Sequence, residues 1–425
     1  MNILIFDDNE SNAKATEQKI VSQEIASHEI SSDGNIVLLF DTKSEKSLTD
    51  FLSNKFFSAV SAILKSSASA DNKELNWIGE FDVLIVDNDL TDLELGGAML
   101  TAESIIGYLR AFTDVPYIIS LNKNHDVDFD LRYLYGDYQS FSDLALNTNH
   151  LSNQRLWGGK SDGEFAPWYW PCIKDAVQRR KNQIEFVENN LQVSAWKALE
   201  FPLAANEYLS LRAKSRFSSG IGIQDATFED FFESSHLLPP KEIKELHAMA
   251  KEGDQLARSA VFRISAYEVD RWLRRDVLVT QDVLIDLPHL LAQMPFLLGD
   301  NAEKLDCWNA VIASKKSPFG LDENLYKNHL ASAQFGHDMW VPGPCFWWPR
   351  LKSDDDLVEH FFTDRNVSWP AALFCEDVSH FVSNTDAEDP PQEFEAEIDG
   401  SWRRRYITNL SGFNYSPPGR IIGKA

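Results

Sequence analysis

Two short stretches, MNILIFDDN at residues 1–9 and FDVLIVDND at residues 81–89, decide how this chain is expected to fold. Each is a run of large apolar residues that ends on aspartates. Apolar runs of this kind are typical of parallel strands that are buried on both faces. If the two strands are neighbours, their carboxyl ends meet at one edge of the sheet, where open α/β sheets bind ligands. The sequence therefore predicts a pocket that contains Asp7, Asp8 and Asp87.

Three more apolar runs complete the predicted sheet, at residues 35–41, 115–121 and 144–146. The segments between the runs carry apolar residues at helical spacing, over residues 11–24, 48–64 and 98–112. Strands that alternate with helices form right-handed βαβ units and an open parallel sheet. The predicted fold class is therefore α/β, with a five-stranded parallel sheet in a first domain over residues 1–155.

The rest of the chain has a different composition and holds most of the 12 tryptophans. Residues 156–330 are predicted to form a mostly helical domain. Residues 331–425 are rich in Trp and Pro and are predicted to form a small α+β segment that packs on the helical domain. The expected helices of this region lie at residues 173–191, 207–217, 228–232, 240–252, 254–273, 287–294 and 300–315, and its expected strands at 371–374 and 405–408.

Composition narrows the classes of function. The formal net charge is −25, which opposes binding to a phosphate backbone. The one dense basic patch, Arg403-Arg404-Arg405, is better interpreted as a solvated edge than as a nucleic-acid contact. No apolar run approaches a membrane span, and the start of the chain has no basic segment typical of a signal peptide. The four cysteines are far apart in the chain, so we expect a cytoplasmic protein with reduced thiols.

The acid-tipped strands indicate a specific chemistry. Mg²⁺ prefers oxygen ligands and often binds one or two carboxylates together with phosphate. A carboxylate attacks a phosphoryl group only when the incoming negative charge is neutralised by a neighbouring cation. A single strand-end aspartate would more commonly cap a helix. Two consecutive acids on one strand and one on the next favour a functional site.

On these residues the N-terminal third of the chain resembles the receiver domain of two-component response regulators. The resemblance rests on Asp7-Asp8 after the first strand, Asp87 after the third, and Ser120 after the fourth. It implies a receiver-like, flavodoxin-like fold in which a histidine kinase or phosphotransfer protein phosphorylates Asp87. It also implies that Asp7, Asp8, Asp87 and Asp89 bind Mg²⁺, with the backbone of Asn88 or Asp89 contributing, and that Ser120 hydrogen-bonds the phosphoryl oxygens.

The sequence departs from the family after the fifth strand. There the family has a lysine that contacts the phosphate, and Asn147 stands at that position, with Lys123 and Lys160 as distant stand-ins. Gly96-Gly97 follows the acceptor strand after a different run from that of the family. We therefore expect phosphate acceptance without the usual conformational switch, in a phosphorelay protein whose output is protein–protein contact or phosphate buffering.

Two alternatives remain open at this point: a pseudo-receiver scaffold whose acids are structural, and an enzyme whose active site lies in the C-terminal region. The protein partner other than the kinase is expected to bind the C-terminal region, and no membrane or nucleic-acid partner is expected. For the enzyme alternative the candidates are His337-Asp338, an anion site at Arg271, Arg274 and Arg275 around Trp272, the aromatic pair Trp347-Trp348, and Cys375-Glu376-Asp377 with His380. The aromatic pair is better interpreted as part of the core or of an interface, and the arginines as a solvated helix face around a buried Trp272. For the last group, the expected local structure is either one helical face that carries Glu376 and His380 or, with preference, a capped helix start with surface acids.

Overall fold

The computed structural model describes residues 1–22, 34–42, 44–45, 47–65, 73–90, 93, 101–122, 140–159, 170–217, 220–314, 319–363, 372–389 and 406–408. Its first part is a sheet of five parallel strands in the order β2-β1-β3-β4-β5, which confirms the α/β class. This order is common among doubly wound α/β folds. The strands are β1 (Ile3–Asp7), β2 (Ile36–Phe40), β3 (Val83–Asp87), β4 (Tyr117–Asn122) and β5 (Leu144–Asn147).

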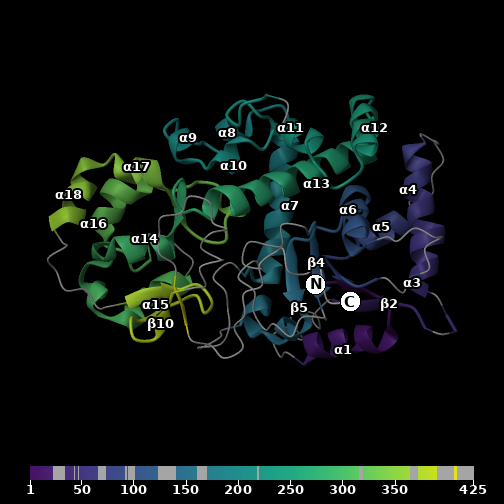
Figure 1. Cartoon of the computed structure of the whole chain (residues 1–425), viewed down its shortest axis with the longest axis horizontal. Coiled ribbons are helices and arrows are strands. Elements are labelled where there is room, and N and C mark those ends of the chain that lie inside the picture. The colour runs from purple at the N-terminus through teal and green to yellow at the C-terminus, as the bar shows by residue number, and fades with distance from the viewer. Residues whose placement is uncertain are drawn as a thin grey trace.

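Helices cover both faces of this sheet (Figure 1). Alternation along β1 sends Leu4 and Phe6 into the core cluster on one face and Ile3 and Ile5 into the cluster on the other. The Ile3 face packs on α1 (Glu10–Val21), η3 (Thr148–Ser152), η4 (Gln154–Trp157) and the start of α7 (Ile173–Asn190). The Leu4 face packs on η1 (Phe51–Phe56), α4 (Phe57–Leu64), α5 (Lys73–Gly79) and α6 (Ala102–Phe112), and α3 (Ser47–Asp50) precedes η1.

The remainder is mostly helical. Its helices are α8 (Ala195–Ala198), α9 (Ala205–Tyr208), α10 (Leu211–Lys214), α11 (Phe228–Glu233), α12 (Pro240–Lys251), α13 (Gln255–Trp272), η5 (Leu273–Leu278), α14 (Leu287–Gln293), η6 (Pro295–Glu303), α15 (Leu305–Ser314), α16 (Glu323–Leu325), η7 (Tyr326–Leu330), η8 (Ala331–Ala333), η9 (Asp338–Trp340), α17 (Trp348–Lys352) and α18 (Asp355–Thr363). Three antiparallel pairs of short strands accompany them: β6 (Leu284–Asp286) with β7 (Cys345–Trp347), β8 (Ala372–Cys375) with β9 (His380–Ser383), and β10 (Ala387–Glu388) with β11 (Ile407–Thr408).

Helix α13 joins the two parts of the molecule. It contacts α6 and α7 beside the sheet and α11 and α12 in the helical part. Its Ile264 and Tyr267 belong to the core cluster of the sheet, whereas its Ala266 and Val269 belong to the helical core. On the other face, Leu151 and Ile173 share one cluster. The core of the sheet therefore continues beyond the predicted domain boundary at residue 155.

Buried charges cross the same junction. Arg180 Nη2 on α7 donates to Asp143 Oδ1 at 2.7 Å and to Asp270 Oδ2 on α13 at 3.1 Å. Asp143 also accepts from Arg110 Nη2 at 2.9 Å, and Asp270 accepts from Arg274 at 2.8 Å. Buried carboxylates are tolerated only when paired in this way. The network fixes the position of β5 relative to α13.

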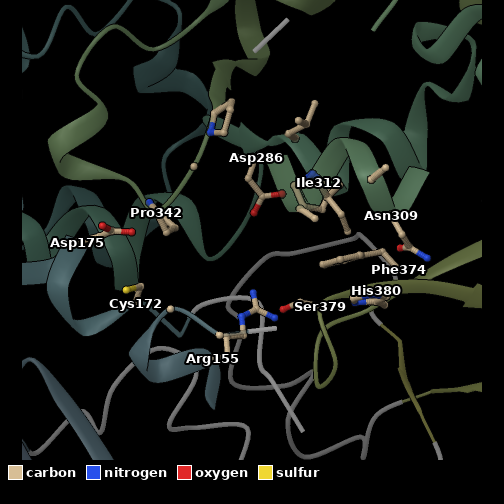
Figure 2. Close-up of a pocket in the computed structure, with 18 residues that line it drawn as sticks. Arg155, Cys172, Asp175, Asp286, Asn309, Ile312, Pro342, Phe374, Ser379 and His380 are labelled. Atoms are coloured by element: carbon tan, nitrogen blue, oxygen red, sulfur yellow. The ribbon is translucent and has the colours of Figure 1, made fainter. Parts of the chain in front are cut away.

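A cavity of about 590 Å³ lies where the connection between β5 and α7 meets the C-terminal part of the chain. Figure 2 shows Arg155 and Cys172 on the side of that connection, with Asp286 at the end of β6 and Asn309 on α15 of the C-terminal part. The hairpin that follows β8 contributes Ser379 and His380. Pro342-Gly343-Pro344 also line it, so the described lining residues come from five stretches that are distant in sequence.

Candidate functional site

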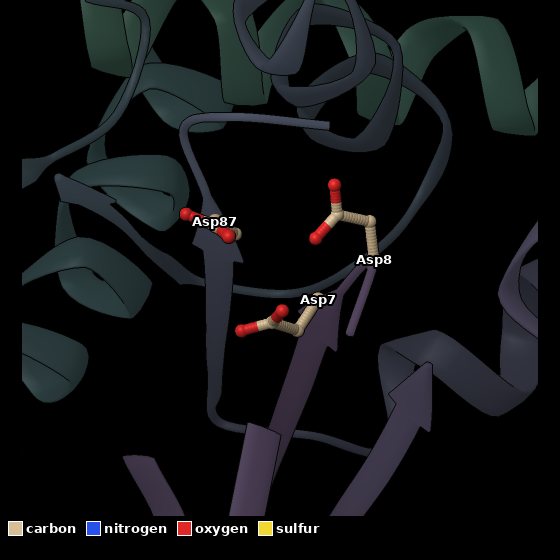
Figure 3. Close-up of side chains that lie close together, drawn as sticks. All are labelled: Asp7, Asp8 and Asp87. Carbon is tan, nitrogen blue, oxygen red and sulfur yellow. The ribbon is translucent and has the colours of Figure 1, made fainter. Parts of the chain in front are cut away.

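Three carboxylates meet at the carboxyl edge of the sheet (Figure 3). Asp7 ends β1, Asp8 follows it, and Asp87 ends the adjacent strand β3. One carboxylate oxygen of each lies within 4.8 Å of those of the others. Asp7 and Asp87 are buried, whereas Asp8 is half-buried. The structure therefore brings together three of the four residues predicted to bind metal.

Local hydrogen bonds hold the two strand ends. Asp7 Oδ1 accepts from the backbone N–H of Asn9 at 3.0 Å, and the Asn9 side chain caps α1 by accepting from Ser11 N. This turn leads from the strand directly into the helix. Asp87 Oδ1 accepts from the backbone N–H of Asp89 at 3.4 Å. The Asp89 side chain is exposed and lies outside the group of three carboxylates.

The electrostatics of the cluster favour a cation. Two like charges 4.8 Å apart repel by about 3 to 4 kcal/mol at an effective dielectric constant of about 20. Burial of two of the three acids removes the water that would otherwise screen them. A donor set made only of carboxylate oxygens matches the preference of hard divalent ions such as Mg²⁺. The residues present thus fit the predicted ion.

Ser120 lies on β4, the strand next to β3, and its hydroxyl contacts the hydroxyl of Ser142. In the β3–β4 register Ser120 pairs with Val86, and Leu121 pairs with Asp87. The Ser120 hydroxyl is 2.9 Å from the Ser142 hydroxyl, which is 2.6 Å from that of Ser140. The structure thus places Ser120 one register step from Asp87, the last residue of β3, within a buried row of serines.

Asn147 ends β5 opposite Asn122 and is buried. Its side-chain oxygen accepts from the backbone N–H of Asn149 at 2.9 Å and so caps η3. Asn147, at the position where the family has a lysine, therefore serves as a helix cap in this structure. Lys123, Lys160, Gly96-Gly97 and Arg403-Arg404-Arg405 lie outside the described residues.

The helical interpretation of Cys375-Glu376-Asp377 with His380 is wrong. These residues form the end of β8, a turn and the start of β9 in a hairpin. Glu376 and Asp377 are buried rather than on the surface, and hydrogen bonds compensate them: Asp377 accepts from the Thr408 backbone at 3.0 Å, and Glu376 bonds His289. Burial raises the pKa of Cys375 to about 12, so its thiol stays protonated at neutral pH and is a poor nucleophile.

The other C-terminal candidates are parts of the core. Trp347 and Trp348 are buried in the helical cluster, as predicted, and so is Trp272. The arginines around Trp272 are not a solvated face: Arg275 is buried, and Arg274 pairs with Asp270. His337 packs against the Phe186 and Phe335 rings, and burial lowers its pKa.

Sequence reasoning missed the buried Arg110–Asp143–Arg180–Asp270 network and also a buried group around His289. His289 Nδ1 lies 2.7 Å from Asp286 Oδ1, and its Nε2 lies 3.0 Å from Glu376 Oε1. The spacing of Asp286 and His289 signals only a helix cap, since Asp286 also accepts from the His289 backbone at 3.0 Å. Glu376 is far along the chain, so nothing local indicates the third member.

Comparison with known proteins gives no relative. No protein-family model, no curated protein and no solved structure matches this chain. Among the helices of the described residues, none is both long and apolar enough to cross a membrane. The acidic cluster at the end of β1 and β3 is thus the observation from which a function has to be argued.

Proposed function

We propose that this protein is a phosphorelay signalling protein that accepts a phosphoryl group on Asp87 in a Mg²⁺-dependent reaction. The observation that carries the proposal is the convergence of Asp7, Asp8 and Asp87 at the carboxyl edge of a parallel sheet. In sheets of this strand order, the carboxyl edge at the reversal of strand order is where ligands bind. The reversal lies between β1 and β3, the two strands that supply the acids.

The roles of the three acids differ by position. Asp87 supplies the oxygen that attacks phosphorus, and the bond between phosphorus and the leaving group of the donor breaks as the acyl phosphate forms. Asp7, Asp8 and Asp87 would hold the Mg²⁺, which would supply positive charge to neutralise the phosphoryl oxygens. The backbone N–H of Asn9 donates to Asp7 Oδ1 and helps to orient this carboxylate.

The test is phosphorylation of the full chain by acetyl phosphate with Mg²⁺, measured as the gain of one phosphoryl group in the intact mass. Wild-type protein is expected to be labelled, and Asp87→Ala is not. Asp50→Ala, which removes an exposed acid on α3, serves as the matched control and stays labelled. Fluoroberyllate, which mimics the phosphoryl group, should block labelling of the wild type.

Two results would overturn the acceptor assignment: no labelling of the wild type, or equal labelling of Asp87→Ala. The first result would favour a scaffold whose acids are structural. A cognate histidine kinase that labels the wild type but not Asp87→Ala would extend the proposal to the partner.

A further inference from the structure

A void of about 40 Å³ lies beside the buried charges that join the sheet to the helical part. Helix α7 contributes four of its described lining residues, and Tyr117 of β4, Asp270 of α13 and Trp340 of η9 contribute further sides. Pro342 lines both this void and the cavity of about 590 Å³, so the two spaces are neighbours. About 15 Å³ of such space is enough for one water, so the void admits a few waters or one small ion.

Buried nitrogen atoms without a protein acceptor gather at this void. Arg180 and Trp340 both line it, and their exposed fractions are 4% and 1%. Among the described residues, neither Arg180 Nε, Arg180 Nη1 nor Trp340 Nε1 has a hydrogen-bond partner. All three atoms carry N–H donors. Because a buried donor without an acceptor is destabilising, the wall fits a guest that accepts several hydrogen bonds.

The carboxylate of the same wall is already engaged by the protein. Asp270 Oδ1 accepts from Gln183 Nε2 at 3.0 Å, and Asp270 Oδ2 accepts from Arg180 Nη2 at 3.1 Å and from Arg274 Nη2 at 2.8 Å. Both of its oxygens are therefore occupied, unlike the three donors. Gln183 Oε1 is a buried acceptor with no partner in the described part of the chain. The wall thus holds more unmatched donors than unmatched acceptors.

The charges of the wall favour an anion. The charged side chains of the described lining are three arginines and one aspartate, namely Arg179, Arg180, Arg274 and Asp270. Behind the wall, Asp143 accepts from Arg180, and Arg110 balances its charge at 2.9 Å. Burial opposes the charge of Arg180, but the Asp143 and Asp270 carboxylates outweigh burial and raise its pKa, so its guanidinium stays charged. The wall therefore carries more positive than negative charge, although the whole chain has a net charge of −25.

We propose that this void binds one small monovalent anion, a halide such as chloride, which accepts hydrogen bonds from Arg180 and Trp340 next to the positive charge of Arg179. A halide accepts hydrogen bonds and donates none, which suits the surplus of donors, and charge-assisted bonds of this kind are the strong ones. An organic anion exceeds a space of about 40 Å³, and three arginines repel a cation. The space beside the ion admits a water that donates to Gln183 Oε1. The proposal goes beyond phosphorylation of Asp87 and does not depend on it.

The first test is chlorine NMR of the full chain, in which bound chloride broadens the chloride line. Wild-type protein should broaden the line, and bromide should reverse the effect by competition, whereas gluconate at equal concentration should not. Trp340→Phe keeps an aromatic ring but removes one donor, so the Kd of chloride should rise about tenfold or more. Trp196→Phe is the matched control. Trp196 Nε1 is also buried without a partner among the described residues but lies outside the void, so the Kd should stay unchanged.

A second variant, Arg179→Gln, covers the case in which Trp340→Phe fails to fold, because Arg179 is only half-buried. It should also raise the Kd about tenfold, whereas Arg258→Gln, which removes an exposed arginine of α13 outside the void, should not. The second measurement compares the Tm in sodium chloride with the Tm in sodium gluconate at equal ionic strength. Wild type and Arg258→Gln should be more stable in chloride, since an anion that binds only the folded state stabilises it, and Arg179→Gln should lose most of the difference.

Three results would overturn the proposal. The wild type could leave the chloride line unbroadened and have the same Tm in both salts, as a void that holds only water would. Gluconate could compete as well as bromide does. Trp340→Phe and Arg179→Gln could both bind chloride with the Kd of the wild type.

Discussion

At the scale of single residues, the acidic cluster follows directly from the sequence. Asp7 and Asp87 end two apolar runs that pair as neighbours, so their side chains had to converge. The surroundings could not be predicted. Ser120 bonds Ser142, whose position depends on how the chain enters β5. His289 and Glu376 meet because two distant segments pack together, and no local pattern records that contact.

Replacement of Asp8 by Asn separates charge repulsion from metal binding. Without divalent ions, Asp8→Asn should raise the free energy of unfolding by about 1 to 2 kcal/mol, because one of three clustered negative charges is lost. Addition of Mg²⁺ should then raise the Tm of the wild type but not that of Asp8→Asn, since an ion that binds only the folded state stabilises it. Thermal unfolding with EDTA and with Mg²⁺ measures both effects. Equal stabilisation of the two proteins by Mg²⁺ would rule out Asp8 as a ligand.

His289 should make stability depend on pH. Burial opposes the charge of its imidazole, but the Asp286 carboxylate and the hydrogen bonds to Asp286 and Glu376 outweigh that effect and raise its pKa. A raised pKa in the folded state gives a stabilisation that is complete below the unfolded value of about 6.5 and is lost as pH rises through the folded value.

The measurement is urea unfolding from acidic to alkaline pH for the wild type and for His289→Gln. At the acidic end His289→Gln should be less stable by about 3 kcal/mol, because two buried carboxylates lose their cation. The difference between the proteins should shrink as pH rises. Parallel stability curves would show that His289 is not the titrating group.

At the scale of elements, the buried parallel strands were the most predictable part of the fold. Buried parallel strands are apolar on both faces, so their sequences are continuous apolar runs that are easy to recognise. The five predicted strands match β1 to β5 to within about two residues at each end. The predicted helix at residues 207–217 is wrong, because the chain breaks into α9 and α10 and Ser210 caps the second by accepting from Ala213 N. The β8–β9 hairpin was not predicted, because acidic residues such as Glu376 and Asp377 are also common in the first turn of a helix.

Helix α6 depends on a glycine for its contact with the helical part. A β-carbon at Gly107 would lie 2.3 Å from the Leu237 carbonyl oxygen. Ala in place of Gly ordinarily stabilises a helix interior by about 1 kcal/mol. Here Gly107→Ala should instead destabilise by about 1 to 3 kcal/mol, because backbone has to move. Urea unfolding of the wild type and of Gly107→Ala measures whether the free energy of unfolding falls or rises.

Gly336→Ala is the control for this substitution. A β-carbon at Gly336 meets no atom within 4 Å, so its effect should stay within about 0.5 kcal/mol. A stabilised Gly107→Ala protein would mean that α6 does not approach residue 237 so closely.

At the scale of the whole molecule, the sheet does not stand alone. One face is covered in part by α13, and the Arg110–Asp143–Arg180–Asp270 network joins the sheet to α7 and α13. A fragment that ends at residue 155 lacks α13, so the residues of the sheet core that contact Ile264 would be exposed to water. It also lacks Arg180, which pairs with Asp143. We expect residues 1–155 to show no cooperative unfolding transition, whereas the full chain unfolds cooperatively.

Circular dichroism and near-ultraviolet spectra of the two proteins, recorded through a thermal ramp, test this expectation. A longer fragment that ends after α13 and keeps Arg180 and Asp270 is the informative comparison, and it should recover part of the transition. A fragment 1–155 with a sharp transition and native near-ultraviolet signal would show that the first domain folds alone.

The double use of α13 also has a consequence for how such a chain could evolve. Recombination at a point between β5 and α7 would transfer the sheet without α7, which covers part of one face. The transferred sheet would also lack Arg180, the ion-pair partner of Asp143. Exchange at that point would therefore be selected against, and the two parts of this protein should be inherited together.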